Sequence, residues 1–266
     1  MNRPRAHGSV TGGHRVFLTG ASSGIGEALA RRYAAQGATL GLFARRRAEL
    51  ERVASAIAPA TAVIYAGDVR EPETLAAAGA DFIGRFGGVD IVIGNAGVSR
   101  GTATGVAEDL PAFKAVFDIN MLGLVHTFQP FLATMQEQRH GVLAGVASIA
   151  GFRGLAGSGA YSASKAAAIV YLESLRLELV GTGVSVVTIC PGFVATPMTA
   201  RNPYPMPFLL APDKAARLMV AAIARGQRFC VLPWQMALVG RVLKVMPRPL
   251  YDIAFARLKR KPRLPA

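Results

Sequence analysis

From Val16 onward, short apolar runs alternate with longer amphipathic segments, and this alternation constrains the fold more than any other feature of the chain. Parallel βαβ units follow this pattern, because a crossover helix separates two parallel strands. The apolar runs are rich in Val, Ile and Leu, as is typical of strands buried on both faces. They predict strands at residues 16–18, 39–44, 61–65, 89–93, 142–148, 184–190 and 228–232. The segments between them predict helices at residues 25–36, 46–58, 72–86, 111–138, 158–180 and 212–225. The 111–138 segment is expected to bend at Gly123 and Pro130.

Length and composition fit one α/β domain with a large core. The 266 residues are 52% hydrophobic and 17% charged, and no uninterrupted run of about 18 apolar residues predicts a membrane-spanning helix. Residues 1–15 lack the apolar stretch of a secretory signal and are expected to form a flexible extension. The main domain is predicted over residues 16–232, followed by a C-terminal tail over 233–266. Cys190 and Cys230 lie in apolar runs, as expected of buried thiols in a reducing cytoplasm, and no disulfide framework or metal site is indicated.

A glycine-rich turn follows the first predicted strand and opens the first predicted helix. It reads Thr19-Gly20-Ala21-Ser22-Ser23-Gly24-Ile25-Gly26. The first glycine allows a tight turn, the second lets a pyrophosphate approach the helix N-terminus, and the third allows close packing of helix and strand. The two serines add hydroxyl donors. A plain turn is the alternative, but the position favours a dinucleotide site on a doubly wound parallel sheet of Rossmann type.

The residues after the second and third predicted strands bear on the choice of cofactor. The second strand runs into three arginines that begin at Arg45, and no acid lies between Leu40 and Ala48. An acid there binds the ribose hydroxyl of NAD, whereas an arginine accommodates the phosphate of NADP. The sequence therefore favours NADP(H) over NAD(H), the alternative being three solvated cations. Asp68 and Val69 are placed to hold the adenine edge, although Asp68 is also suited to cap a helix.

Tyr161 and Lys165 are four residues apart, which places both side chains on one face of a helix. An ammonium beside a phenol favours the phenolate and lowers the phenol's pKa. A tyrosine with a lowered pKa exchanges a proton with a substrate oxygen near neutral pH. An amphipathic helix with a solvated lysine is the alternative. The upstream dinucleotide site and the hydroxyl of Ser148 favour the catalytic interpretation.

At this point the chain resembles the short-chain dehydrogenases/reductases, over about residues 16–232. The resemblance rests on six motifs in order: the glycine-rich turn, Asn95-Ala96-Gly97, Asn120, Ser148, Tyr161 with Lys165, and Pro191-Gly192. It implies a Rossmann-type catalytic domain with the nicotinamide above the carboxyl ends of the strands.

The resemblance also implies roles for individual residues. Tyr161 would be the general acid or base, and Lys165 would bind the nicotinamide ribose and lower the pKa of Tyr161. Ser148 would hydrogen-bond the substrate oxygen, and Asn120 would hold a water that links Lys165 to solvent. The cofactor would also contact two further sets of residues. These are Asn95, Ala96 and Gly97 beside the central strand, and Pro191, Gly192 and Thr196 beside the nicotinamide carboxamide.

In this family the segment after Pro191-Gly192 largely determines the substrate. Residues 193–210 are apolar, contain four prolines and no acid, and are expected to form a mobile lid. We therefore expect an apolar carbonyl/alcohol substrate such as a lipid, acyl chain, steroid-like or xenobiotic ketone. Packing of this segment on the core or on a partner subunit is the alternative.

The C-terminal tail concentrates positive charge. The net charge of the chain is +14. Residues 230–266 carry eight cations against one acid, Asp252, so the net charge of this tail is half of that total. Two helical stretches, 234–246 and 250–258, combine Trp234 and apolar residues with cations and lead to Lys259-Arg260-Lys261. This pattern fits peripheral contact with an anionic membrane surface. Packing on the lid or at a dimer interface is the alternative. No nucleic-acid-binding motif is present, and the family resemblance implies a homodimer or homotetramer.

The sequence thus predicts an NADP(H)-dependent cytoplasmic carbonyl reductase or dehydrogenase, with a place in lipid metabolism and a possible position at the inner face of a membrane. One alternative is a 3-oxoacyl-carrier-protein reductase, whose acidic carrier protein would suit the positive charge. A non-enzyme alternative is a cofactor-sensing or membrane-surface scaffold protein.

Overall fold

The computed structural model describes residues 13–200, 202–257 and 260–263. Its centre is one seven-stranded sheet with the order β3-β2-β1-β4-β5-β6-β7, in which every neighbouring pair is parallel. The strands are β1 (Arg15–Thr19), β2 (Thr39–Ala44), β3 (Ala62–Ala66), β4 (Ile91–Gly94), β5 (Gly141–Val146), β6 (Val184–Pro191) and β7 (Phe229–Leu232). Each predicted strand is present, with its ends within two residues of the predicted ones. The order reverses between β1 and β4, which creates a crevice at their carboxyl ends.

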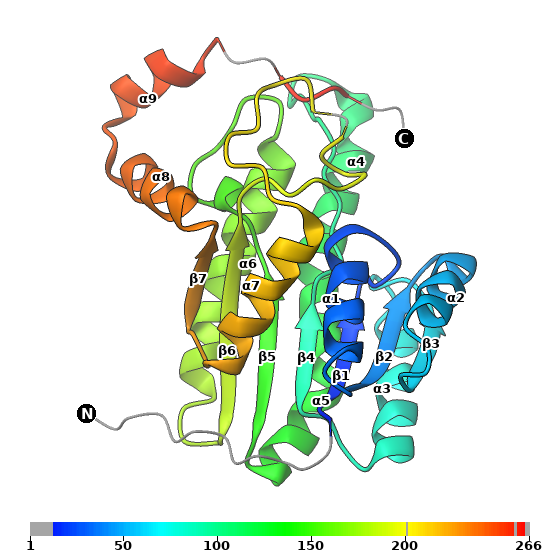
Figure 1. Ribbon diagram of the computed structural model, residues 1–266. Helices are drawn as coiled ribbons and strands as arrows, with labels where there is room; N and C mark the ends of the chain where they lie inside the picture. Colours follow the sequence, from blue (N-terminus) through cyan, green and yellow to red (C-terminus); the bar gives the residue numbers. More distant parts are fainter. Residues whose placement is uncertain (1–12, 201, 258–259, 264–266) are drawn as a thin grey trace.

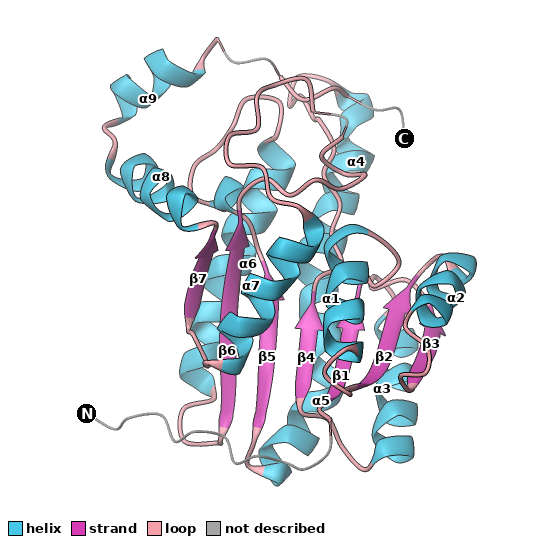
Figure 2. Ribbon diagram, in the orientation of Figure 1, coloured by secondary structure: helices cyan, strands magenta, loops and turns pink. Residues whose placement is uncertain are grey.

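Helices cover both faces of the sheet, as Figures 1 and 2 show. One face carries α1 (Gly24–Ala34), α2 (Arg47–Ala56) and α7 (Pro212–Ala224). The other carries α3 (Pro72–Phe86), α5 (Gly123–Gln138) and α6 (Gly159–Glu178), and α4 (Leu110–Phe117) packs beside α6. Each face has its own apolar core, with Leu29, Leu50 and Met219 in one and Phe82 and Phe128 in the other. The predicted α/β doubly wound fold is confirmed.

The folded part begins earlier than predicted. The sequence pattern predicts Arg15 in the flexible extension, but it is the first residue of β1. Its Nη2 lies 2.7 Å from Oδ1 of Asp90, and its backbone N–H donates to Oδ2 of the same carboxylate. This ion pair joins the amino ends of β1 and β4, which explains why the strand extends past Val16. Residues 1–12 of the predicted extension lie outside the described residues.

The single bent helix predicted over residues 111–138 is wrong in detail. The structure has two helices, α4 and α5, joined by a π-helical turn, Asp118–Leu122. Pro130 lies inside α5, so the helix continues through it, and a bend there stays a prediction. The departure from regular α-helix falls instead on the turn that contains Asn120. A π-helical turn alters the side-chain phase by adding a residue, and the hydrophobic period does not reveal it.

The described part of the C-terminal tail forms two helices, α8 (Trp234–Val245) and α9 (Arg248–Phe255). The tail is joined to the loop after β5, because the Tyr251 hydroxyl donates to the Gly154 carbonyl at 2.7 Å. The Arg153 guanidinium lies 4.2 Å from the centre of the Tyr251 ring and donates to backbone carbonyls at the end of α8. Within the described residues, none of the helices is both long and apolar enough to cross a membrane.

Candidate active site

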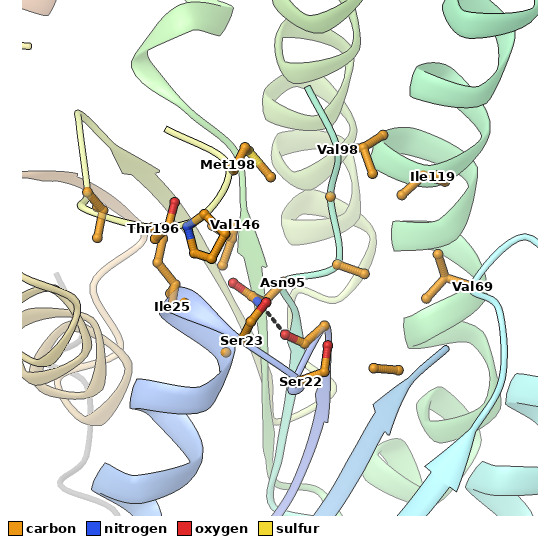
Figure 3. A pocket seen from close by; sticks show the side chains of 18 of the residues that line it. Ser22, Ser23, Ile25, Val69, Asn95, Val98, Ile119, Val146, Thr196 and Met198 are labelled. Carbon is orange, nitrogen blue, oxygen red and sulfur yellow. Dashed lines mark hydrogen bonds between the residues drawn. The ribbon is translucent and has the colours of Figure 1, made fainter. Parts of the chain in front are cut away.

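A pocket of about 320 Å³ opens at the carboxyl ends of the central strands. Every predicted site residue except Asn120 lines it: Gly20, Ser22, Ser23, Gly24, Ile25, Gly26, Arg45, Asp68, Val69, Asn95, Ala96, Gly97, Ser148, Tyr161, Lys165, Pro191, Gly192 and Thr196. Figure 3 shows Ser22 and Ser23 at the start of α1, with Thr196 and Met198 from the segment after β6 across the pocket from Val98 and Ile119. Residues far apart in the sequence therefore share one site.

The glycine-rich turn is built as a phosphate cradle requires. Gly20 has a φ of +69°, and a Cβ on Gly26 would overlap the Gly20 carbonyl oxygen. The Asn95 amide donates to the carbonyls of Thr19 and Gly20 at 3.1 and 3.2 Å, which fixes the turn against β4. Ser23 occupies the N-cap of α1 but makes no capping hydrogen bond with its side chain. The first N–H groups of α1 therefore lack a capping side chain, and this fits a phosphate at the helix N-terminus.

Two arginines line the end of the pocket next to β2. Arg46 Nη2 donates to the hydroxyls of Ser22 and Ser23 at 3.2 and 3.3 Å. Arg45 lies beside it, with its Nη1 3.9 Å from Oδ2 of Asp68. Of these two arginines only Arg45 is predicted from the sequence as a cofactor residue, although the run of three arginines is a signal for Arg46 as well. Arg47 does not line the pocket and pairs with Glu51 on the surface at 4.0 Å.

Asp68 lies at the pocket but does not cap a helix, because the N-cap of α3 is Glu71. Its carboxylate accepts hydrogen bonds from the backbone N–H and the guanidinium of Arg70, at 3.0 and 2.7 Å. Burial acts to raise the pKa of Asp68, but these hydrogen bonds outweigh burial and the pKa lies below its ordinary value. Asp68 is thus ionised at neutral pH, and contact with the adenine remains a prediction.

Helix α6 and the end of β5 bring the three proton-handling candidates together. Tyr161 and Lys165 lie on one face of α6 and both line the pocket. Lys165 Nζ is buried, donates to the Val146 carbonyl at 2.8 Å and lies 6.0 Å from the centre of the Tyr161 ring. Ser148 follows β5 by two residues, and its Oγ accepts from the Ala150 N–H at 3.1 Å. A phenol, a hydroxyl and an ammonium therefore converge beside the pocket.

The protonation of the tyrosine differs from the expectation. Burial raises the pKa of Tyr161 above its ordinary value, and a hydrogen bond with the Ser148 side chain opposes this rise. Burial also lowers the pKa of Lys165 to about 8. The predicted lowering of the Tyr161 pKa is wrong for this geometry, because the effect of burial is the larger one. Tyr161 is therefore a protonated donor at neutral pH.

Asn120 lies behind the pocket and not in its lining. Its side-chain oxygen accepts from the Val98 N–H at 2.8 Å, and its amide donates to the Val98 carbonyl and to Ser164 Oγ, each at 3.0 Å. The side chain is thus engaged with protein partners, and a role of Asn120 in holding water stays a prediction. A Cβ built on Gly97 would lie 3.3 Å from Asn120 Oδ1 and 3.5 Å from Lys165 Nζ, which places Asn120 beside the lysine.

The remaining wall of the pocket is apolar and comes from residues that were not selected as site residues. Val98, Ile119, Val194 and Met198 line it. Met198 belongs to the predicted lid segment, whose ends are paired through the hydrogen bonds Ala195 N to Leu210 O and Leu210 N to Phe193 O, both 2.9 Å. The apolar composition of residues 193–210 was the available signal. The sequence carries no signal for Val98 and Ile119 as pocket residues, because an apolar residue in a loop or helix is more often part of a core than of a binding site.

Comparison with known proteins agrees with this geometry. The sequence model of the short chain dehydrogenase family matches residues 14–205. An uncharacterized oxidoreductase of Myxococcus xanthus is 40% identical over 252 residues, which cover 92% of this chain and 97% of the relative. The ketoacyl reductase HetN of Nostoc sp. is 34% identical over 217 residues, covering 79% of this chain and 75% of that one. An 11-beta-hydroxysteroid dehydrogenase 1A of Arabidopsis thaliana is 36% identical over 191 residues, covering 70% and 54%.

Solved structures with the same fold include dehydrogenases and reductases. Levodione reductase superposes with a TM-score of 0.78 at 24% identity, covering 85% of this chain and 98% of that one, and supports the fold alone. An alcohol dehydrogenase from Thermococcus sibiricus, in complex with 5-hydroxy-NADP, superposes with a TM-score of 0.73 at 27% identity, covering 82% and 95%. By its sequence, its fold and its relatives, this chain belongs to the short-chain dehydrogenase family of oxidoreductases.

Proposed function

We propose that this enzyme is an NADP(H)-dependent reductase or dehydrogenase that interconverts an apolar carbonyl and its alcohol, with Tyr161 as general acid or base. One observation carries the proposal. Tyr161, Ser148 and Lys165 meet at one end of a pocket whose other end holds the uncapped N-terminus of α1 and two arginines. A dinucleotide spans such a pocket from its phosphates to its nicotinamide, and a bound nicotinamide supplies or accepts the hydride.

The protein residues handle the proton and the developing charge. In the reductive direction the Ser148 hydroxyl donates a hydrogen bond to the carbonyl oxygen, which gains negative charge as the carbon accepts the hydride. The phenol of Tyr161 gives its proton to that oxygen, and the alcohol forms. The raised pKa of Tyr161 keeps the phenol protonated before the step. A proton from solvent then restores the phenol for the next turnover.

The preference for NADP(H) rests on Arg45 and Arg46, since two guanidinium groups at the β2 end of the pocket suit the additional phosphate. We expect Arg45→Asp and Arg46→Ala each to weaken NADPH binding by about ten- to a hundredfold, the value of a charge-assisted hydrogen bond of ~1.5–3 kcal/mol. NADH binding should change much less. Arg47→Ala is the matched control, because Arg47 lies outside the pocket.

Titration of NADPH and NADH against these variants, followed by fluorescence, is the direct measurement. Equal affinity of the native protein for both dinucleotides, or an equal effect of Arg47→Ala, would reject the preference. Failure of the native protein to bind either dinucleotide would reject the enzymatic proposal as a whole.

The apolar substrate is proposed from the other wall of the pocket. The residues that line this wall, Val98, Val194 and Met198, are uncharged and apolar. In the lid segment, Phe193 and Tyr204 pack together with ring centres 6.3 Å apart. Two relatives bear names that refer to ketoacyl and steroid substrates. A screen of aliphatic ketones, steroid ketones and 3-oxoacyl thioesters with NADPH tests this. Activity confined to short, polar carbonyl compounds would contradict it.

A membrane-facing role for the tail is proposed from α8 and α9. Trp234, Leu238, Val242 and Val245 form one exposed stripe along α8, and Ile253 of α9 is exposed as well. Arg241, Lys244, Arg248 and Arg257 lie in the same tail, which suits anionic lipid. Co-sedimentation with phosphatidylglycerol vesicles should fall several-fold in the double variant Trp234→Ser, Leu238→Ser. Unchanged co-sedimentation, together with loss of a homodimer or homotetramer in light scattering, would instead assign the stripe to a subunit interface.

A further inference from the structure

The last described residues, Arg260–Arg263, form a strap that returns to the active-site side of the molecule. Figure 1 draws it as the red segment beside α4. Arg263 Nε lies 2.8 Å from Oδ2 of Asp109, immediately before α4. A side chain on Gly101 would overlap the backbone of Lys261 and Pro262, and one on Gly157 would lie 2.9 Å from Cβ of Arg260. The strap therefore packs on the loops that follow β4 and β5.

These two loops frame the catalytic residues. The backbone N–H of Thr102 donates to the Gly157 carbonyl at 3.1 Å, so the loops are joined to each other beneath the strap. The first loop continues from Gly97 in the pocket, and the second connects Ser148 to Tyr161. The strap rests on both of these loops, so it lies close to the catalytic residues that they carry.

Lys261 is the strap residue that faces the catalytic tyrosine. Its Nζ lies 5.9 Å from the centre of the Tyr161 ring and donates to Ser99 Oγ at 2.7 Å. Burial lowers the pKa of Lys261. Among the residues that the structure describes, it has no carboxylate partner. Lys261 is partly buried, and burial of a charge without a counter-charge carries a desolvation cost.

We propose that Lys261 is a specificity residue that binds a carboxylate of the substrate, close to the reacting carbonyl. The substrate class is then an oxo acid, or the corresponding hydroxy acid, with an apolar body. This inference rests on the proposed function, since it takes Tyr161 to mark the position of the reacting oxygen.

The charges around Tyr161 support an anionic group over a neutral one. Two ammonium groups lie near Tyr161, that of Lys165 at 6.0 Å and that of Lys261 at 5.9 Å from the centre of its ring. Lys165 already donates to a backbone carbonyl, whereas the only side-chain partner of Lys261 is a neutral hydroxyl, within the described part of the chain. Asp68, an acid in the pocket lining, pairs with Arg70. A carboxylate beside Lys261 would pair a cation that a neutral ketone leaves unpaired.

The test compares an oxo acid with its methyl ester, which has the same carbon skeleton without the charge. Medium-chain 2-oxo and 3-oxo acids and their esters are assayed with the native enzyme and with Lys261→Gln, Lys261→Arg and Arg257→Gln. Lys261→Gln should lower kcat/KM for the acids by about ten- to a hundredfold, mainly through KM, and leave the esters within about threefold. Lys261→Arg should restore most of the loss. Arg257→Gln, an equal charge change at an exposed tail position, should have no effect.

Two results would overturn the proposal. One is an equal fall of acid and ester activity with a shifted pH profile, which would make Lys261 a residue that tunes Tyr161. The other is a native enzyme that prefers the esters. Calorimetric binding of the acid and the ester to the NADPH-loaded protein gives a second readout that needs no turnover. Binding of the acid that depends on Lys261, without turnover, would retain this inference and reject the proposed reaction. Turnover that does not depend on Lys261 would retain the proposed reaction and reject this inference.

Discussion

Substitution of Asp90 by asparagine is expected to destabilise the fold without impairing the site. The Asp90 carboxylate accepts from the Arg15 backbone N–H and guanidinium at 2.7 Å each, and lies 3.1 Å from His140 Nε2. These partners connect the amino ends of β1, β4 and β5, whereas the pocket lies at the carboxyl ends of the strands. Burial acts to raise the pKa of Asp90, but its hydrogen bonds, above all those from Arg15, lower it to about 2.

The magnitude follows from that pKa. An unfolded aspartate has a pKa of about 3.9, and each pH unit of difference corresponds to about 1.36 kcal/mol. The charged form is therefore favoured in the native state by on the order of 2 kcal/mol. Because the folded pKa is the lower one, this stabilisation is complete above about pH 4 and is lost as the pH falls toward 2. Asp90→Asn should lower the free energy of unfolding by about that amount at pH 7.

Urea denaturation at several pH values is the assay, with Asp252→Asn as the control. Asp252 is exposed and has no ion pair among the described residues, so the same chemical change should have little effect there. The deficit of Asp90→Asn should shrink as the pH falls below 4, and kcat should stay within about twofold because the pair is remote from the pocket. A variant as stable as the Asp252 control, or a deficit that grows in acid, would refute the reasoning.

Three further predictions concern the site. Lys165→Met should raise the free energy of unfolding at pH 7, because burial lowers the native pKa of this lysine to about 8. This gain in stability over the native protein should narrow between pH 8 and about 10.4, where the lysine is neutral in the folded protein and still charged in the unfolded chain. A gain that does not change with pH in urea denaturation would contradict this. Asn120→Ala removes two hydrogen bonds with Val98 and one with Ser164 and should cost ~1–3 kcal/mol in urea denaturation, with weaker dinucleotide binding. Native dinucleotide affinity would show that the loop at Val98 does not depend on Asn120. Gly26→Ala should weaken NADPH binding at least tenfold because its Cβ meets the Gly20 carbonyl, whereas Gly84→Ala, in open space on α3, should bind normally; equal affinities would refute the close approach.

The local sequence was sufficient to predict the sheet and most of the pocket. Strand patterns in a parallel sheet are strong, because strands such as β4 and β5 are apolar on both faces. Once the strands are placed, parallel topology brings their carboxyl ends to one edge. This topology therefore places three features in one site: the turn at Gly20, the arginine after β2 and the serine after β5.

The features that were missed depend on distant contacts. The π-helical turn at Asn120 is accompanied by its three hydrogen bonds to Val98 and Ser164, which no local pattern encodes. The pKa of Tyr161 depends on burial by segments from elsewhere in the chain. The sequence pattern places Lys261 only in a basic tail, because its position beside Tyr161 arises when the chain returns over two loops. Short-range rules treat such a lysine as solvated.

The most direct test of the central claim is the kinetics of Tyr161→Phe, measured together with its dinucleotide affinity. Removal of the phenol oxygen deletes the proposed proton donor and leaves the phosphate cradle intact. We predict that kcat with the best carbonyl substrate falls by about 10²–10⁴-fold while the Kd for NADPH stays within about threefold of the native value. A variant that keeps native turnover would contradict the assignment of Tyr161 as the acid and base of this enzyme.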